Sequence, residues 1–382
     1  MPRILIDVTR LLYRRVTGTL PTGIDRVSLA YIGHYPGARA VLSLGPFSAI
    51  LSEGDSREVL DRLPRDERVL ALAARVVAKA FLWRWLAPAA PGDVLLNTGH
   101  TGLENRHYAT MLRRCGARLV VVVHDLIPIS HPQFSRPREQ ARHRVRMCVV
   151  ASRAAAVIVN SQDTAGALRD FARSEGIALG ALHVALLGPG LPRHPTGPRP
   201  LDEPYFLVLG TLERRKNHAL LLDVWARWGA GAPRLVVIGQ PGAMSDAITR
   251  RLGASPALRA RVLHLERCSD VELCTWMHHA NALLLPSFAE GFGLPLLEAV
   301  SRTVPAIASD LQVFREVAGP VPDYLDPRDR DGWERLLHRY ALADGPERRA
   351  QIERARRYSP PDWQRHFRVV DGVIESMREP RP

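Results

Sequence analysis

Residues 282–298 read ALLLPSFAEGFGLPLLE, an apolar strand followed by a glycine turn and the start of a helix. The run Leu283–Leu285 is typical of a parallel strand that is buried on both faces. Pro295 stands where the helix begins, because proline is tolerated in the first helical turn. The glycines of the turn let backbone amides approach a ligand closely, and a helix amino terminus favours an anion. The stretch therefore predicts a βα unit whose turn faces a bound molecule.

The same alternation of short apolar runs and longer helical stretches extends along the whole chain. It predicts strands at residues 3–8, 94–97, 118–124, 155–160, 183–187, 205–210, 234–239, 262–265, 282–286 and 305–309. Parallel strands joined by helices form doubly wound sheets, which bind ligands outside the carboxyl ends of their strands. We therefore expect an α/β protein with two Rossmann-like doubly wound domains that face a central cleft.

One segment between the predicted strands is too rich in breakers to join either core. Residues 188–204 contain six prolines and three glycines, a composition typical of an interdomain linker. We expect an N-terminal domain at residues 1–190, a linker at 191–204 and a C-terminal domain at 205–358. Residues 359–382, with apolar side chains at helical spacing, are expected to form a last helix that packs back on the N-terminal domain.

Composition narrows the function classes. The net charge is +13, yet only Lys79 and Lys216 are lysines, so the excess of arginine indicates codon bias more than a nucleic-acid surface; no RNA- or DNA-binding motif accompanies it. Such a charge favours anionic partners, either nucleotide phosphates or an anionic membrane face. The four cysteines form no CxxC pair and no zinc spacing. We expect no signal peptide and no membrane-spanning helix, hence a cytoplasmic protein.

Two carboxylates stand out in the turn and helix quoted first. Glu290 and Glu298 are separated by seven residues, so both can face one bound molecule. Within EGFGLPLLEA, and with VPAIASDLQVFREVAG at 304–319, they resemble the donor-site signature of the family-four retaining glycosyltransferases, which have the GT-B fold. The segments GTLERRKN at 210–217 and VHDLIP at 123–128 agree with this resemblance. It covers essentially the whole chain and is strongest after residue 205.

The resemblance implies roles for these residues. Glu298 would hydrogen-bond the ribose hydroxyls of a nucleotide-sugar donor, and Glu290 would contact the donor sugar. The backbone amides beside the sugar would be those of Phe292, Gly293 and Leu294. The C-terminal domain would therefore hold the donor, and the N-terminal domain the acceptor.

A second candidate segment follows the first strand of the C-terminal half, where Gly210 begins a turn that carries Arg215 and Lys216. A leaving nucleotide diphosphate develops negative charge, and fixed cations stabilise it more in the transition state than in the ground state. A forked guanidinium and a compact ammonium suit that task. Many members of the family carry an arginine directly after the glycine, where this chain has Thr211. A solvated basic helix start is the alternative.

In the N-terminal half, His124 stands where a four-valine strand ends. The resemblance places it near the donor sugar, with its side chain on a hydroxyl and its backbone carbonyl at the reacting centre; a purely structural histidine is the alternative. Gly23 and Arg26 lie in a glycine turn that enters a helix. Similar segments of the family lie near the donor phosphates and the acceptor, although a plain turn with a helix cap fits the sequence nearly as well.

The sequence predicts neither a metal nor a cofactor. Its only DxD, Asp329 to Asp331, lies in a polar loop flanked by proline, and we interpret it as a solvated turn. Arg215 and Lys216 would take the place of a divalent ion. No nucleophile with a dedicated base is apparent, which agrees with the retaining chemistry of the family, and we name no catalytic base.

The resulting hypothesis is a metal-independent hexosyltransferase of surface polysaccharide biosynthesis. It would move mannose, or another hexose or deoxyhexose, from a nucleotide sugar to a glycan or a lipid-linked oligosaccharide. Two alternatives stay open: a catalytically silent GT-B carbohydrate-binding or assembly scaffold, and a nucleotide-sugar epimerase. The basic stretch 136–153 and the apolar stretch 69–86 leave peripheral contact with the anionic inner face of a membrane open as well.

Overall fold

The computed structural model describes residues 3–44, 47–65, 69–83, 92–191, 197–242, 246–342 and 344–377. It divides into two compact units, which are Met1–Leu187 with Trp363–Pro382, and Gly188–Asp362. We call them the first and the second unit. The chain passes between them after Leu187. Residues 188–190, expected in the N-terminal domain, belong to the second unit, as do residues 191 and 197–204 of the expected linker.

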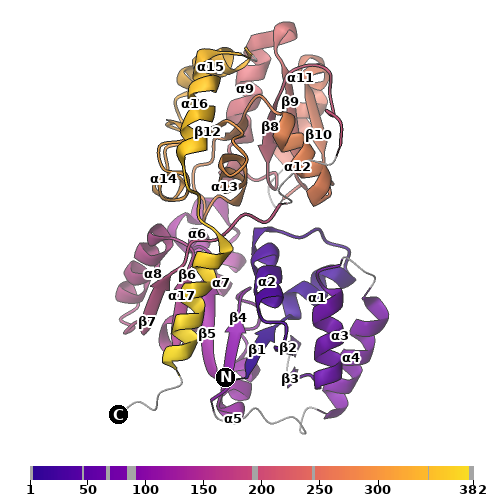
Figure 1. The fold of residues 1–382 in the computed structure, drawn as a ribbon, viewed down its shortest axis with the longest axis vertical. Coiled ribbons are helices and arrows are strands. Elements are labelled where there is room, and N and C mark those ends of the chain that lie inside the picture. Colours follow the sequence, from indigo (N-terminus) through magenta and orange to yellow (C-terminus); the bar gives the residue numbers. More distant parts are fainter. Residues whose placement is uncertain are drawn as a thin grey trace. The chain divides into compact units, whose positions relative to one another are not determined.

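The first unit is built on a seven-stranded sheet of order β3-β2-β1-β4-β5-β6-β7, parallel except for the pairing of β2 with β3. Its strands are β1 (Ile4–Asp7), β2 (Arg39–Leu44), β3 (Phe47–Ile50), β4 (Val94–Asn97), β5 (Arg118–Val123), β6 (Ala156–Val159) and β7 (Ala181–Val184). Its helices are α1 (Thr9–Val16), α2 (Gly23–His34), α3 (Glu53–Arg62), α4 (Leu70–Trp83), α5 (Arg106–Cys115), α6 (Ile127–Ser130), α7 (Pro137–Arg153), α8 (Gln162–Ser174) and α17 (Trp363–Ser376). Helices lie on both faces of this sheet (Figure 1).

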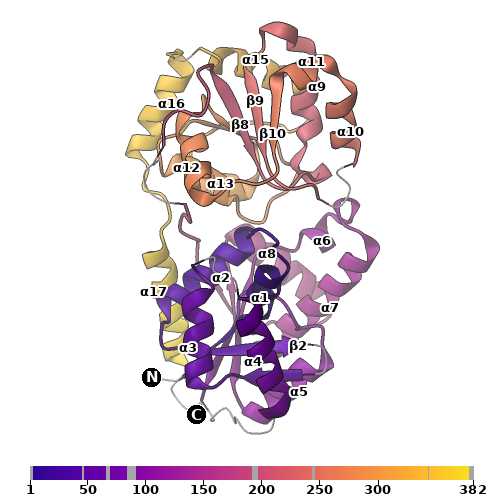
Figure 2. The same ribbon diagram turned by 90° about the vertical axis from the view of Figure 1, so that its right-hand side faces the viewer.

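The second unit has a six-stranded, all-parallel sheet of order β10-β9-β8-β11-β12-β13. Its strands are β8 (Tyr205–Leu209), β9 (Arg234–Ile238), β10 (Val262–Leu265), β11 (Leu283–Leu285), β12 (Ala306–Ser309) and β13 (Asp323–Leu325). Its helices are α9 (His218–Trp228), α10 (Asp246–Ala254), α11 (Pro256–Arg261), α12 (Asp270–His279), α13 (Leu294–Val300), α14 (Gln312–Ala318), α15 (Arg330–Tyr340) and α16 (Pro346–Arg357). Figure 2 shows α9 and α16 on opposite sides of this sheet.

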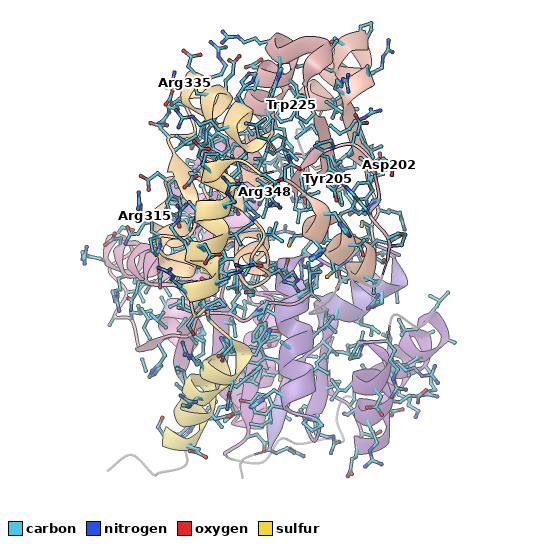
Figure 3. The ribbon with its side chains drawn as sticks, turned by 45° about the horizontal axis from the view of Figure 1, so that its top comes forward. Asp202, Tyr205, Trp225, Arg315, Arg335 and Arg348 are labelled. Atoms are coloured by element: carbon cyan, nitrogen blue, oxygen red, sulfur yellow. The ribbon has the colours of Figure 1, made fainter. Side chains whose placement is uncertain are left out.

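Both sheets owe their burial to unbroken apolar strands. All five residues of β8 are buried, as are the four valines of β5; parallel strands covered by helices on both faces need such runs. Figure 3 shows Tyr205 and Trp225 inside the second unit, whereas Arg315 and Arg335 lie at its surface. The predicted pair of parallel-sheet, Rossmann-like halves is confirmed.

The last helix belongs to the first unit. Phe367 on α17 packs edge-on against Tyr31 of α2, with ring centroids 5.1 Å apart. His366 joins the carbonyl of Ala185 at 3.0 Å and the hydroxyl of Tyr31 at 2.9 Å. The helix expected within residues 359–382 thus begins at Trp363 and is anchored by aromatic packing and two buried hydrogen bonds.

One residue near the carboxyl end of α13 has an unfavourable backbone conformation. Thr303 has φ +56°, which glycine tolerates but a β-branched residue adopts only under strain. Its amide donates to Val300 O at 3.1 Å, and the next amide, that of Val304, donates to Ala299 O at 2.9 Å. These bonds close the helix end and hold the strained residue in place.

We predict that Thr303→Gly raises the free energy of unfolding by about 0.5–1 kcal/mol, because the left-handed conformation ceases to cost energy. Thr275→Gly inside α12 is the control, and it should lower stability by about 0.5 kcal/mol or more, because glycine is a poorer helix former than threonine and a buried side chain is lost. Thermal and urea denaturation measure both. A Thr303→Gly protein no more stable than the native chain would contradict the prediction.

Candidate functional site

The candidate residues of the second unit follow two strands that are neighbours in the sheet but not in the sequence. β8 pairs with β11 in parallel, so the loops that follow them leave the sheet at the same edge. The first loop begins at Gly210 and contains a 3₁₀ turn, Arg214–Lys216. The second carries Glu290 and leads into α13. The topology therefore brings the two predicted motifs together.

Glu290 is the centre of a compact ion cluster. Its Oε1 accepts from Lys216 Nζ at 2.5 Å and from the hydroxyl of Ser287 at 2.7 Å. Its Oε2 accepts from Arg215 Nη1 at 2.9 Å. The side chains of Glu290, Lys216 and Arg215 are only 8, 13 and 15 % exposed. Three predicted residues thus form one buried cluster. Ser287, which the sequence analysis did not indicate, is a fourth member.

The electrostatics of this cluster favour the charged form of Glu290. Burial alone raises the pKa of the carboxyl, but Lys216 and Arg215 outweigh it and lower the pKa to about 2. A carboxylate out of water needs such paired and hydrogen-bonded partners. Glu290 is therefore an anion, and a hydrogen-bond acceptor, at neutral pH.

Arg215 also ties the two loops together. Its Nη1 donates to Ala289 O at 2.6 Å, and its own carbonyl accepts from the amide of Phe288 at 2.8 Å. Its Nη2 reaches Glu213 Oε2 at 3.3 Å. The planar guanidinium serves one carboxylate, one carbonyl and a second carboxylate at once. The cations are thus positioned by the protein itself.

Glycine is required where the turn after β8 meets the loop after β9. A Cβ on Gly239 would lie 2.0 Å from Gly210 O, which no side chain permits. Gly210 has φ +125°, and a Cβ there would stand 3.1 Å from Lys216 Cε. The predicted role of Gly210 in ligand binding is untested. Its visible role is to give Lys216 room.

The turn between Glu290 and α13 is closely packed. Phe292 and Leu294 are buried, and Gly293 has φ +93°, where a Cβ would lie 2.6 Å from the ring of Phe314. Gly293 precedes the first helical residue, Leu294, and Pro295 follows in the first turn. These residues occupy the strand-to-helix turn that the sequence predicts for them.

Glu298 is wholly buried in α13. Its Oε1 accepts from the amide of Gly190 at 3.3 Å. Arg302, which no motif indicated, donates from Nη1 to Glu298 O at 2.8 Å and from Nη2 to Leu191 O at 2.7 Å. The available signal was the spacing of four residues, which places Arg302 beside Glu298 on one side of a helix.

In the first unit, His124 follows β5 and is buried. Its Nε2 lies 2.7 Å from Thr98 O, and since a carbonyl only accepts, Nε2 is the donor. Burial lowers the pKa of His124, so the ring is neutral and its Nδ1 is an acceptor. The backbone carbonyl of His124 accepts from Asn160 Nδ2 at 2.9 Å and from Thr164 Oγ1 at 3.4 Å.

His100 lies beside His124, and a third histidine, His143, lies beside His100. The ring centroid of His100 lies 5.3 Å from that of His124 and 5.8 Å from that of His143. Burial, reinforced by the neighbouring histidines, holds the pKa of His100 well below its ordinary value. His100 also has φ +58°, a strained conformation that often marks a functional loop.

Gly23 and Arg26 lie at the start of α2, with Gly23 exposed and Arg26 half-buried. Between them in sequence, buried Asp25 accepts from the amide of Thr22 at 2.7 Å and pairs with two arginines of α1. These are Arg10 at 2.8 Å and Arg14 at 2.9 Å. The turn is therefore a well-built helix cap, and Asp25 with its two arginines is a feature that the motifs did not indicate.

The DxD motif has structural partners. Asp329 Oδ1 accepts from the amide of Gly332 at 2.9 Å and caps α15. Asp331 pairs with Arg227 at 3.3 Å. Across the described ranges, the structure has no group of three or more histidine, cysteine, aspartate or glutamate side chains arranged to hold a metal ion.

The basic and apolar stretches that the sequence analysis associates with a membrane surface are parts of two helices. The basic stretch 136–153 is α7, where Arg144 pairs with Glu175 at 2.7 Å and Arg146 with Glu104 at 2.6 Å. The apolar stretch 69–86 includes α4, and residues 84–86 lie outside the described part. Of the helices that the structure describes, none is both long and apolar enough to cross a bilayer.

Comparison with known proteins shows that part of the chain is similar to a described protein family. Residues 194–358 match the family described as Glycosyl transferases group 1. The matched part is less than half of the chain. Residues 194–358 contain the Glu290 cluster and Glu298, so these candidate site residues lie within the matched part.

Two curated relatives are bacterial mannosyltransferases. The serotype-specific mannosyltransferase WbdA of Escherichia coli is 28 % identical over 247 residues, which are 59 % of this chain and 30 % of WbdA. The O-antigen chain mannosyltransferase RfbU of Salmonella typhimurium is 32 % identical over 136 residues, 35 % of this chain and 38 % of RfbU. The aligned part of the chain thus spans about a third of each relative's length.

Solved structures share the fold over nearly the whole chain. HepE of Anabaena in complex with UDP-glucose has a TM-score of 0.67 at 16 % identity and covers 99 % of this chain and 100 % of its own. Sucrose-phosphate synthase of Thermosynechococcus elongatus has a TM-score of 0.62 at 17 % identity, with 99 % and 98 % covered. The predicted GT-B fold class is confirmed.

The ion cluster predicts how Glu290 contributes to stability at low pH. Because its pKa is lowered from 4.5 to about 2, its contribution is complete above pH 4.5 and is lost as the pH falls towards 2. Glu290→Gln lacks this contribution. We expect the native chain to lose about 3 kcal/mol more than Glu290→Gln across this range.

Urea denaturation at closely spaced pH values measures the difference. Glu334→Gln on α15 controls for the loss of one negative charge on the same unit, and it should follow the native curve. Equal acid sensitivity of the native chain and Glu290→Gln would show that the cluster does not lower the pKa of this carboxyl.

Proposed function

We propose that the chain is a retaining glycosyltransferase that moves a sugar from a nucleotide sugar to a glycan or glycolipid acceptor in surface polysaccharide biosynthesis. The observation that carries the proposal is the buried cluster of Glu290, Lys216 and Arg215. It lies within residues 194–358, which match the group 1 glycosyl transferase family. Two cations at the end of β8, held by a carboxylate at the end of β11, suit a reaction in which a diphosphate leaves.

The cations of the cluster have hydrogen-bonding capacity for such a ligand. An ammonium carries three donors and a guanidinium five. Lys216 and Arg215 can therefore keep Glu290 and still donate to phosphate oxygens. As the glycosidic bond breaks, negative charge grows on the leaving diphosphate, and the fixed cations stabilise it without reorganising. They would serve in place of a metal ion, so we propose that neither a metal nor a cofactor is needed.

Glu290 and Glu298 receive separate tasks in this proposal. Glu290, anionic and fixed at both oxygens, would accept hydrogen bonds from hydroxyls of the donor sugar. Glu298, eight positions later in α13, would accept from the ribose hydroxyls. The amides of Phe292, Gly293 and Leu294 would lie beside the sugar, with Gly210 next to the diphosphate.

The first unit would supply the acceptor side. His124 would accept a sugar hydroxyl at Nδ1, since its Nε2 is the donor to Thr98 O. Gly23 and Arg26 would lie near the phosphates and the acceptor. No residue is assigned as the base; a leaving phosphate oxygen would take the proton of the acceptor.

Mannose is the sugar that the relatives favour, because both WbdA and RfbU are named mannosyltransferases. GDP-mannose is therefore the first donor to test, followed by UDP-hexoses and deoxysugar nucleotides. A cytoplasmic location with peripheral contact to an anionic membrane would suit a lipid-linked acceptor.

Calorimetric titration without added metal tests the donor site. We predict that one nucleotide diphosphate binds the native chain, that EDTA leaves its affinity unchanged, and that Lys216→Ala weakens it at least about tenfold by removing a charge-assisted contact. Lys79→Ala is the matched control, because Lys79 is the other lysine of the chain and pairs with Asp55 on the first unit.

The outcomes separate the candidate functions. Release of nucleotide from a nucleotide sugar without acceptor marks a transferase, whereas binding of glycan alone marks the scaffold. If no nucleotide binds, or if Lys216→Ala binds like the native chain, the proposed donor site is wrong.

A further inference from the structure

Glu298 and Arg302 both hold the same short segment of backbone, residues 188–191, with which the second unit begins. Glu298 accepts from the amide of Gly190 at 3.3 Å. Arg302 donates to the carbonyl of the next residue, Leu191, at 2.7 Å. The other arm of Arg302 returns to the carbonyl of Glu298 itself at 2.8 Å. The bonds form a closed ring that runs from the Glu298 side chain through the segment and the guanidinium back to the Glu298 backbone.

The weakest bond of this ring is the one to the functional carboxylate. At 3.3 Å, the Gly190 contact lies at the long end of the range for an amide donor. The two Arg302 contacts are short and charge-assisted, which makes them the stronger ones. A small displacement of the segment would therefore break the Gly190 contact, and Arg302 is the group that prevents this displacement.

The geometry of the guanidinium suits this task. Its planar fork donates in two directions at fixed separation, so it sets the distance between α13 and the segment. An ammonium in its place has no such fork. Leu191 is buried, whereas Gly190 is exposed, so the segment is anchored to the protein at Leu191. Glu298 is wholly buried as well, so the donor on Gly190 compensates part of the cost of burying its charge.

We propose that Arg302 is a positioning residue for nucleotide binding. Through Leu191 and Gly190 it fixes the Glu298 carboxylate where ribose hydroxyls donate to it. The inference rests on the proposed function, because it takes Glu298 as the ribose contact. A carboxylate offers about four acceptor positions, so the Gly190 amide and two ribose hydroxyls can share it.

A positioning role differs from a general structural role in what it does to ligand discrimination. If Arg302 only stabilises the second unit, its loss weakens all nucleotides alike. If it positions Glu298, its loss weakens ribonucleotides and leaves nucleotides without ribose hydroxyls unaffected. The ratio of the two affinities therefore reports on the carboxylate alone.

The experiment measures binding of GDP and UDP, and of their 2′,3′-dideoxy counterparts, by calorimetry. The proteins are the native chain, Arg302→Ala, Arg302→Lys, Glu298→Ala and the pair Arg302→Ala with Glu298→Ala. Arg354→Ala is the matched control, because Arg354 also holds a backbone carbonyl of the second unit, Val321 O, at 3.0 Å. Melting temperatures establish that each variant is folded.

We expect Arg302→Ala to lower the preference for the ribonucleotide about tenfold, the value of one charge-assisted hydrogen bond. The dideoxy affinity should stay at the native value. Arg302→Lys should keep part of the preference, and adding Arg302→Ala to Glu298→Ala should have no further effect. Arg354→Ala should leave the preference intact.

Other results overturn the inference in distinguishable ways. Equal weakening of both nucleotides in Arg302→Ala, or no change in either, rejects the positioning role while the donor site stands. If the native chain binds the ribonucleotide and its dideoxy counterpart equally well, Glu298 is not the ribose contact, and the positioning role of Arg302 is rejected too. A native chain that binds no nucleotide rejects the proposed function itself. If Arg302→Ala does not fold, the comparison of Arg302→Lys with the native chain decides by the same ratio.

Discussion

The second unit depends on a carboxylate that is kept charged out of water. Glu290 is buried, and burial by itself opposes its charge; Lys216 and Arg215 reverse that balance from the loop after the neighbouring strand. Removing either partner of a buried ion pair leaves an uncompensated charge, which is far more costly than the pair itself is favourable. The cluster therefore fixes the two loops to each other, and the glycine contacts behind Lys216 follow from that close approach.

The same cluster constrains any anionic ligand. Lys216 and Arg215 are not bare cations, because Glu290 and Glu213 already offset their charge. Attraction to a diphosphate must then come from directed hydrogen bonds more than from net charge, since four groups of opposite sign nearly cancel at a distance. Such a site selects an anionic ligand by the geometry of its hydrogen bonds. This agrees with hydrogen-bonding groups that are fixed by contacts between the two loops.

The sequence predicted most strands of both sheets but missed β2, β3 and β13. Apolar runs such as Leu119–Val123 locate central strands, because burial on both faces demands them. The strands β3 and β13 lie at sheet edges, where hydrogen bonding to one neighbour defines a strand without an apolar run, and neither was predicted. The internal strand β2 was missed as well, although it is buried. The edge strand β7 was expected at 183–187 but is Ala181–Val184. Likewise the motifs located Glu290 and Lys216, whereas their pairing depends on β8 lying beside β11, an order that no local pattern encodes.

The hydrogen-bond partners of His124 determine which ring nitrogen donates and which accepts before any ligand binds. Its carbonyl is occupied by Asn160 and Thr164, and its Nε2 proton by Thr98. With the ring neutral, Nδ1 can only accept. A phosphate oxygen has no proton to offer it at neutral pH, whereas a sugar hydroxyl does. The tautomer thus favours a hydroxyl over an anion at this position, and burial of the ring disfavours the protonated state that would reverse that preference.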